Sequence, residues 1–230
     1  MRPARSAVAA DPTREDIVPL LRGVSHLYSA YIAAAAGVVL VVLAPEPLNR
    51  LCAVLYGAAL LGLFAVSGLY HRWRWNPRWR PALRRLDHCT IFVFIAASST
   101  PLALLVLSGT TQLMVLILAW AAAAAGVALS LSWIDAPRGL VAAAYVLAGL
   151  AATIGLPQIL ERLPTAPLIL LAVGAGLYIV GAVVYALRRP NPWPRVFGFH
   201  ELFHALVVAA ATTHFAALSG WVLLRASMTG

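Results

Sequence analysis

Seven long apolar runs, separated by short polar breaks, constrain this chain more than any other feature. A helix of about 20 apolar residues crosses the roughly 30 Å of hydrocarbon in a bilayer. With 62% hydrophobic and 11% charged residues, the 230-residue chain has too few polar groups to cover a water-soluble globule. The sequence therefore predicts an all-α integral membrane protein. The runs lie near residues 24–44, 50–71, 87–107, 112–132, 138–157, 167–187 and 199–224.

The breaks between the runs contain residues that end helices. Proline recurs in them, often beside asparagine, aspartate or a second proline. Alternating strands of about ten residues, which an outer-membrane barrel requires, are absent from the sequence, and no internal repeat divides the runs. We therefore expect a polar N-terminal segment at residues 1–22 and one seven-helix transmembrane domain over residues 23–230.

The basic residues predict how the bundle is oriented. All 17 are arginine, and loops rich in arginine stay on the cytoplasmic side of a membrane. If the N-terminus lies inside, only Arg50, Arg162 and Arg225 fall on the outer side. We expect a cytoplasmic N-terminus, an outer C-terminus and a multi-pass location in the inner membrane. The net charge of +9 comes from arginines that set the topology and face anionic lipid head groups. The expected partners are therefore membrane lipids and not nucleic acid.

Two histidines at the start of the last run, His200 and His204, point toward metal binding. Residues four apart on a helix lie on the same face, one turn from each other. Imidazole is a common zinc ligand, but zinc takes three or four donors, so the pair alone is not sufficient. Two polar residues at a water interface are the simpler interpretation of the pair.

The predicted topology brings other polar residues to the depth of this pair. His71 ends the second run and Asp87 begins the third, both on the cytoplasmic side. Ionisable groups near hydrocarbon face the bundle interior and have partners. We predict a metal site with His71, His200 and His204 as ligands, and with a fourth position open to a water that Asp87 binds or orients. Ser67, one turn before His71, lies close enough to hydrogen-bond into the site. A polar cluster without a metal is the alternative.

Several motifs follow one another in order along the chain. They are Arg22-Gly23 with His26, Ser67-Gly68-Leu69-Tyr70-His71, Arg84-Arg85-Leu86-Asp87-His88 with Ile91, Thr100-Pro101, and His200-Glu201-Leu202-Phe203-His204. In this order they resemble the haemolysin III family, the bacterial branch of the progestin and adipoQ receptors, which include the adiponectin receptors. The likeness runs from about residue 22 to residue 225. Ala97 and Ser99 stand where the family commonly shows glycine and tyrosine, a departure that concerns helix packing and not the metal ligands.

The resemblance implies a seven-helix bundle with its N-terminus inside and one zinc ion near the cytoplasmic face. The family's three histidine ligands match His71, His200 and His204 in this sequence. Its aspartate, which holds the zinc-bound water, matches Asp87, and its serine matches Ser67.

Four further ionisable residues have structural interpretations. His26, near the inner end of the first run, either lies behind the metal ligands or anchors its helix at the interface. His88 and Glu201 each point about 100° away from the site residue beside them, so we expect them to have structural roles. His214 lies about 21 Å deeper than the start of the last run, where polar packing in the core is expected.

The predicted site leaves several functions open. Zinc with an open position can polarise a carbonyl, so hydrolysis of a lipid amide or ester is the expected reaction if the chain is an enzyme. A zinc-stabilised regulator or sensor of membrane lipid homeostasis is the alternative. A membrane metalloprotease with an HExxH motif would use Glu201 as its base, but no acidic residue follows Glu201 as a further ligand. A pore-forming haemolysin fits less well, because a bundle charged only at its rims has no polar lumen.

Overall fold

In the computed structural model, which describes residues 18–225, seven helical spans are long and apolar enough to cross a membrane. Within these residues there is no strand beyond an isolated bridge between Trp193 and Phe197. This confirms the predicted all-α fold. Of the polar segment expected at residues 1–22, residues 1–17 lie outside the described part of the chain. The spans are α1 (Val24–Leu43), α2 (Pro47–Arg72), α3 (Arg80–Leu105), α4 (Gly109–Ser132), Arg138–Arg162, α7 (Thr165–Leu187) and Phe199–Leu223.

The fifth span lies where the run near 138–157 was expected, but it extends to Arg162 and is not one continuous α-helix. α5 (Arg138–Gly149) passes through a 3-10 segment, Leu150–Gly155, into the short α6 (Leu156–Arg162). Pro157 lies in the first turn of α6. Proline has no N–H to donate and clashes with the preceding turn, so it begins a helix more readily than it continues one.

α3 begins at Arg80, seven residues before the apolar run that predicted it. Pro81 lies in its first turn. Backbone N–H groups in a first turn have no acceptor within the helix, so proline loses no hydrogen bond there. Hydropathy detects where a chain enters hydrocarbon. The first part of α3 is rich in arginine, so the apolar run does not include it. Asp87 therefore lies about two turns inside a regular helix and not at its end.

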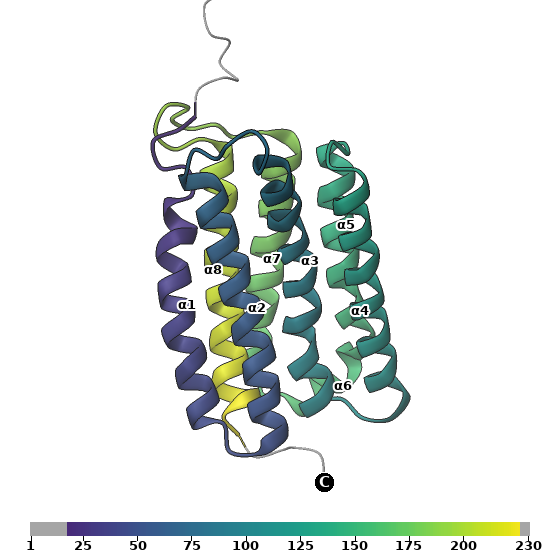
Figure 1. The fold of residues 1–230 in the computed structure, drawn as a ribbon. Helices are drawn as coiled ribbons and strands as arrows, with labels where there is room; N and C mark the ends of the chain where they lie inside the picture. Colours follow the sequence, from purple (N-terminus) through teal and green to yellow (C-terminus); the bar gives the residue numbers. More distant parts are fainter. Residues whose placement is uncertain (1–17, 226–230) are drawn as a thin grey trace, which may run out of the picture.

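α3 is the most deeply buried of the spans. In its apolar stretch 61% of the residues are buried, against 22% in α1. It packs against α2, α4 and α5, while α1 packs on α2, and α7 packs on α8 (Phe199–Leu218). The described chain begins at one end of the bundle and finishes at the other, as an odd number of crossings requires (Figure 1).

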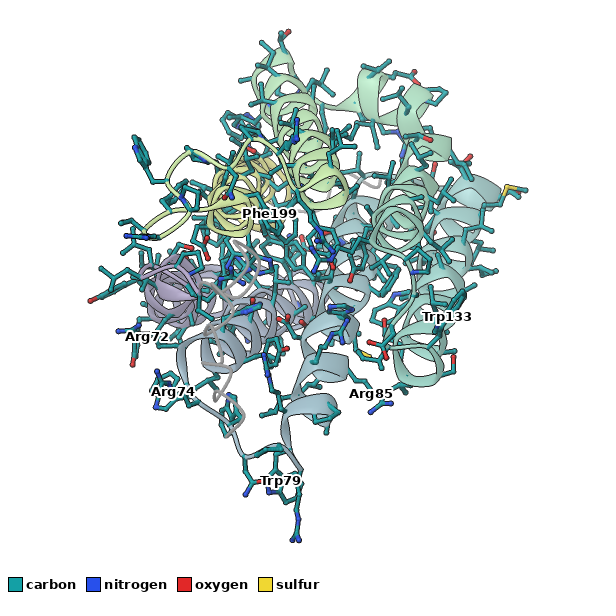
Figure 2. All side chains as sticks on the ribbon, turned by 90° about the horizontal axis from the view of Figure 1, so that it is seen from above. Arg72, Arg74, Trp79, Arg85, Trp133 and Phe199 are labelled. Atoms are coloured by element: carbon teal, nitrogen blue, oxygen red, sulfur yellow. The ribbon has the colours of Figure 1, made fainter. Side chains whose placement is uncertain are left out.

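The end of the bundle at which α1 begins is also where α2 finishes and α3 and α8 begin (Figure 1). The loop between α2 and α3 projects outward there, with Trp79 near its tip (Figure 2). Phe199, the first residue of α8, lies over the interior of the bundle in the same view. Residues far apart in the sequence thus meet at one depth.

Asn49 holds the opposite end of the bundle together. α8 finishes in a π-helical turn, Ser219–Leu223, whose last carbonyl groups have no partner further along the helix. The buried Asn49 amide, in the first turn of α2, donates hydrogen bonds to the carbonyl oxygens of Leu223 at 3.1 Å and Arg225 at 2.8 Å. One side chain therefore caps the last helix from a different helix.

Replacing Asn49 with alanine should lower the free energy of unfolding by about 1–3 kcal/mol, because it removes the donor from buried carbonyl groups. Denaturant unfolding of the detergent-purified protein measures this change. Asn76→Ala is the matched control, because Asn76 lies in an exposed loop and accepts a hydrogen bond from the Arg78 backbone N–H. A stability equal to that of the wild type in Asn49→Ala would contradict the capping role.

Candidate metal centre

Three histidines meet where α2 ends and α8 begins. His71 lies in the last turn of α2, and His200 and His204 lie in the first turns of α8. One ring nitrogen of each lies within 4.8 Å of the others. The Nε2 atoms of His71 and His200 are 3.1 Å apart, although the residues are separated by 129 positions. The structure therefore brings the three predicted ligands together as one histidine cluster.

The spacing of the histidine cluster suits a metal ion. Nitrogens that each lie about 2.0–2.1 Å from a tetrahedral zinc ion are roughly 3.4 Å apart. The 3.1 Å separation of His71 and His200 is close to this value, and the third ring needs only a small movement. Nδ1 of His204 is buried and has no hydrogen-bond partner among the described residues. The cluster therefore fits zinc or a similar first-row ion, and the donor type does not discriminate among these ions.

Asp87 brings a carboxylate to the histidine cluster. Its Oδ2 atom lies 3.5 Å from Nε2 of His71, and the residue is only 7% exposed. That separation is longer than a typical hydrogen bond and short enough for both side chains to contact one small ligand. Ser67 of α2 is also buried and lines the same cavity as His71 and Asp87. The positions of Asp87 and Ser67 agree with the roles predicted for them, which stay predictions.

His26 of α1 lies directly behind one histidine of the cluster. Its ring stacks on that of His204, with centroids 3.8 Å apart and the planes at 4°. It is buried, and neither ring nitrogen has a hydrogen-bond partner among the described residues. This favours the predicted position behind the ligands over an anchor at the interface.

Gly23 allows the start of α1 to approach the histidine cluster. Its φ of +74° lies in the left-handed region that only glycine adopts readily. A Cβ atom at this position would also lie 2.8 Å from Cβ of His71. The Arg22-Gly23 pair in the sequence therefore reflects a close contact between the start of α1 and His71 of the histidine cluster.

Glu201 is engaged at the N-terminus of α8. Its carboxylate forms an ion pair with the Arg22 guanidinium, and Oε2 accepts a hydrogen bond from the backbone N–H of Gly198 at 2.9 Å. A carboxylate at this position satisfies a free N–H group and interacts favourably with the helix dipole. These contacts fit the structural role expected for Glu201 and disfavour its use as the base of a metalloprotease.

The other two histidines lie outside the cluster. His88 adjoins Asp87 in sequence but is not one of the three grouped ligands. His214 lies deep in α8, and its Nε2 atom is 3.1 Å from the carbonyl oxygen of Leu171 on α7. Polar packing was expected for His214, but the sequence did not identify this partner.

The histidine cluster opens into a cavity of about 260 Å³ in the bundle interior. The cavity also reaches Leu218, about 21 Å beyond His204 along α8. Hydropathy gives no sign of it, because a space between helices depends on how side chains of different helices meet. Its apolar lining includes Leu63, Ile91, Phe94, Leu102, Val207 and Leu218.

Comparison with known proteins identifies the family of this chain. A family model described as haemolysin-III related matches residues 17–215. The chain belongs to the haemolysin-III related family. Its relatives include the Hemolysin-3 homolog of Bacillus subtilis (strain 168), 26% identical over 161 residues, which are 70% of this chain and 72% of the relative. Hemolysin-3 of Bacillus cereus is 23% identical over 211 residues, which are 90% and 93% of the two chains.

Shorter matches connect this haemolysin-III related chain with eukaryotic proteins. The adiponectin receptor protein of Drosophila melanogaster is 44% identical over 54 residues, 21% of this chain and 12% of the relative. Heptahelical transmembrane protein 5 of Arabidopsis thaliana is 54% identical over 46 residues, 18% and 12% of the two chains. The resemblance predicted from the motifs is confirmed. With the seven apolar spans, these relatives also establish a multi-pass membrane protein.

Metal analysis of the purified protein should find one ion per chain. His71→Ala and His204→Ala should each lose it, because two remaining histidines are too few donors to retain zinc. Inductively coupled plasma mass spectrometry gives the stoichiometry. His88→Gln is the control, since His88 lies outside the cluster and should leave the metal in place. Folded His71→Ala protein with a full complement of metal would refute the site.

Glu201→Gln should retain the metal but lower the free energy of unfolding by about 2 kcal/mol, because Arg22 loses its charged partner. Unfolding and metal analysis of the same preparation separate the two effects. A double variant, Glu201→Gln with Arg22→Met, should recover part of the lost stability. Loss of metal from a folded Glu201→Gln protein would show that Glu201 serves the metal site.

Proposed function

We propose that this protein is a zinc-dependent hydrolase that cleaves an amide or ester bond in a membrane lipid. The observation that carries the proposal is the position of the histidine cluster and Asp87 at one end of an apolar cavity. Three imidazoles suit a catalytic metal with an open position. The cavity suits the acyl chain of a lipid.

Zinc held by the histidine cluster would supply a Lewis acid that polarises the carbonyl group of the lipid. Asp87 accepts a proton from the water molecule that attacks the acyl carbon. It then returns the proton to the leaving nitrogen or oxygen as the C–N or C–O bond breaks. Ser67 donates a hydrogen bond within the site and helps to orient the reacting groups. The products are a fatty acid and an amine or an alcohol.

A lipid can reach the cavity from the side of the bundle. A second hollow of about 450 Å³ lies between α5 and α7 and is lined by apolar side chains, several of them alanine. Val146, Ile179 and Ala182 line both this hollow and the cavity. A small movement of these side chains would join the two spaces and admit an acyl chain directly from the bilayer.

We infer that the site lies near the cytoplasmic face of the inner membrane, with the N-terminus inside. The loop at this end of the bundle carries several arginines, and such loops stay in the cytoplasm. Arg72, Arg74 and Arg85 lie around this end in the view from above (Figure 2). Inner-leaflet lipids are then the natural substrates, and anionic head groups are the natural neighbours of the loop.

A regulator without catalysis is the second candidate. The ligands come from α2 and α8, so a bound ion would join two helices and stabilise the bundle. The names of the bacterial relatives refer to haemolysis, but a cavity with a largely apolar lining offers little support for an ion-conducting pore.

Replacing Asp87 with asparagine should reduce hydrolysis by at least about 100-fold, because the general base is lost. Turnover is measured on panels of ceramides and phospholipids in mixed micelles with metal-loaded protein. Asp135→Asn is the matched control, since Asp135 is an exposed acid paired with Arg84. Equal background turnover in wild type and Asp87→Asn would reject the hydrolase. If chelation then still lowered the melting temperature, the regulator would be supported.

A further inference from the structure

A second group of polar side chains lies in the cavity, away from the histidine cluster. His214 of α8 and Tyr178 of α7 both line the cavity, and their rings meet edge to face with centroids 5.4 Å apart. His214 lies about 15 Å beyond His204 along α8, which places it well inside the hydrocarbon. Polar groups at such a depth are costly unless they have partners.

The hydrogen-bonding capacity of this pair is only partly used. Nε2 of His214 lies 3.1 Å from the carbonyl oxygen of Leu171, which can only accept, so Nε2 carries the proton. A neutral ring then has a lone pair on Nδ1. The hydroxyl of Tyr178 is buried and has no hydrogen-bond partner among the described residues. Because buried polar groups in native proteins are almost always bonded, the Tyr178 hydroxyl points to a ligand, and His214 adjoins it in the cavity.

Three other hydroxyl groups that line the cavity, those of Ser98, Ser99 and Thr153, are already committed as donors. Ser98 and Ser99 donate at 3.0 Å and 2.9 Å to a carbonyl oxygen of their own helix. Thr153 donates at 2.6 Å to a carbonyl oxygen in the 3-10 segment. Such local bonds occupy the proton of the hydroxyl. Tyr178 has a free donor and His214 has a free acceptor, so together they complement a hydroxyl group.

Gly174 of α7 makes room for His214. A Cβ atom at Gly174 would lie 2.6 Å from Nε2 of His214 and 2.6 Å from Oγ1 of Thr213. The missing side chain thus lets the imidazole lie between α7 and α8, within bonding distance of Leu171. The position of His214 is therefore part of the packing of these two helices.

We propose that Tyr178 and His214 form a subsite for a hydroxyl group carried on the chain of the bound lipid. This inference rests on the proposed lipid hydrolysis and adds a substrate class, lipids with an acyl chain hydroxylated near its middle. The hydroxyl group donates to Nδ1 of His214 and accepts from Tyr178. An unsubstituted chain leaves both groups without a partner, which disfavours its binding.

Binding of fatty acids, the acid products of the proposed reaction, tests the subsite. Detergent-purified, metal-loaded full-length protein is titrated by competition against radiolabelled stearate. Stearate with a hydroxyl on its twelfth carbon should bind about tenfold more tightly than stearate. Stearate with a hydroxyl on its terminal carbon should bind no more tightly than stearate, because that group would lie beyond the subsite.

Two tyrosine variants provide a matched comparison. Tyr178→Phe removes one hydroxyl and should abolish the tenfold preference without weakening the binding of stearate or the metal. Tyr56→Phe makes the same change at another buried hydroxyl that has no partner among the described residues. Tyr56 is not among the residues that line the cavity, so this variant should keep the preference.

The outcomes separate this inference from the proposed function. If stearate binds and the mid-chain hydroxyl adds nothing, or if Tyr178→Phe keeps the preference, the subsite is refuted and the lipid site stands. If the wild-type protein binds no fatty acid, both the subsite and the lipid hydrolase are refuted.

Discussion

The shortage of hydrogen-bond partners inside a bilayer determines much of this structure. Hydrocarbon offers none, so a polar group in a span is costly unless the chain or a ligand supplies its partner. Thr100 and Ser130 meet this need locally, each donating to the carbonyl oxygen four residues earlier in its own helix. Ionisable side chains cannot be satisfied in this way. Their concentration at one end of the bundle allows several helices to share the cost of burying them.

Much of the fold follows from the sequence, because span length and hydropathy reflect the same bilayer thickness. The number and order of the spans were predicted correctly. Features that do not depend on the thickness of the hydrocarbon layer, such as where a helix begins or changes its winding, were not predicted. α3 starts at Arg80 because a helix can extend beyond the membrane, where hydropathy no longer follows it. The 3-10 segment at Leu150–Gly155 depends on local backbone geometry around Pro157, which a run of apolar residues conceals.

The site was predictable to the extent that it follows from spacing and depth. His200 and His204 share a helix face at any position of that helix, and topology brings His71 and Asp87 to the same level. Contacts that depend on how a helix is rotated and on which helices lie beside it could not be predicted from the sequence. The stacking of His26 on His204 and the meeting of Tyr178 with His214 belong to this second kind. The family relationship supports the fold, while the metal and the reaction remain our proposals.

The order of the cluster histidines along the chain has a consequence for biogenesis. His71 leaves the ribosome early, but His200 and His204 belong to the final span. The histidine cluster therefore cannot close until that span has been synthesised and inserted. A chain arrested before this point would contain only one of the three histidines of the cluster. Metal binding by the cluster would thus report that assembly of the bundle is complete.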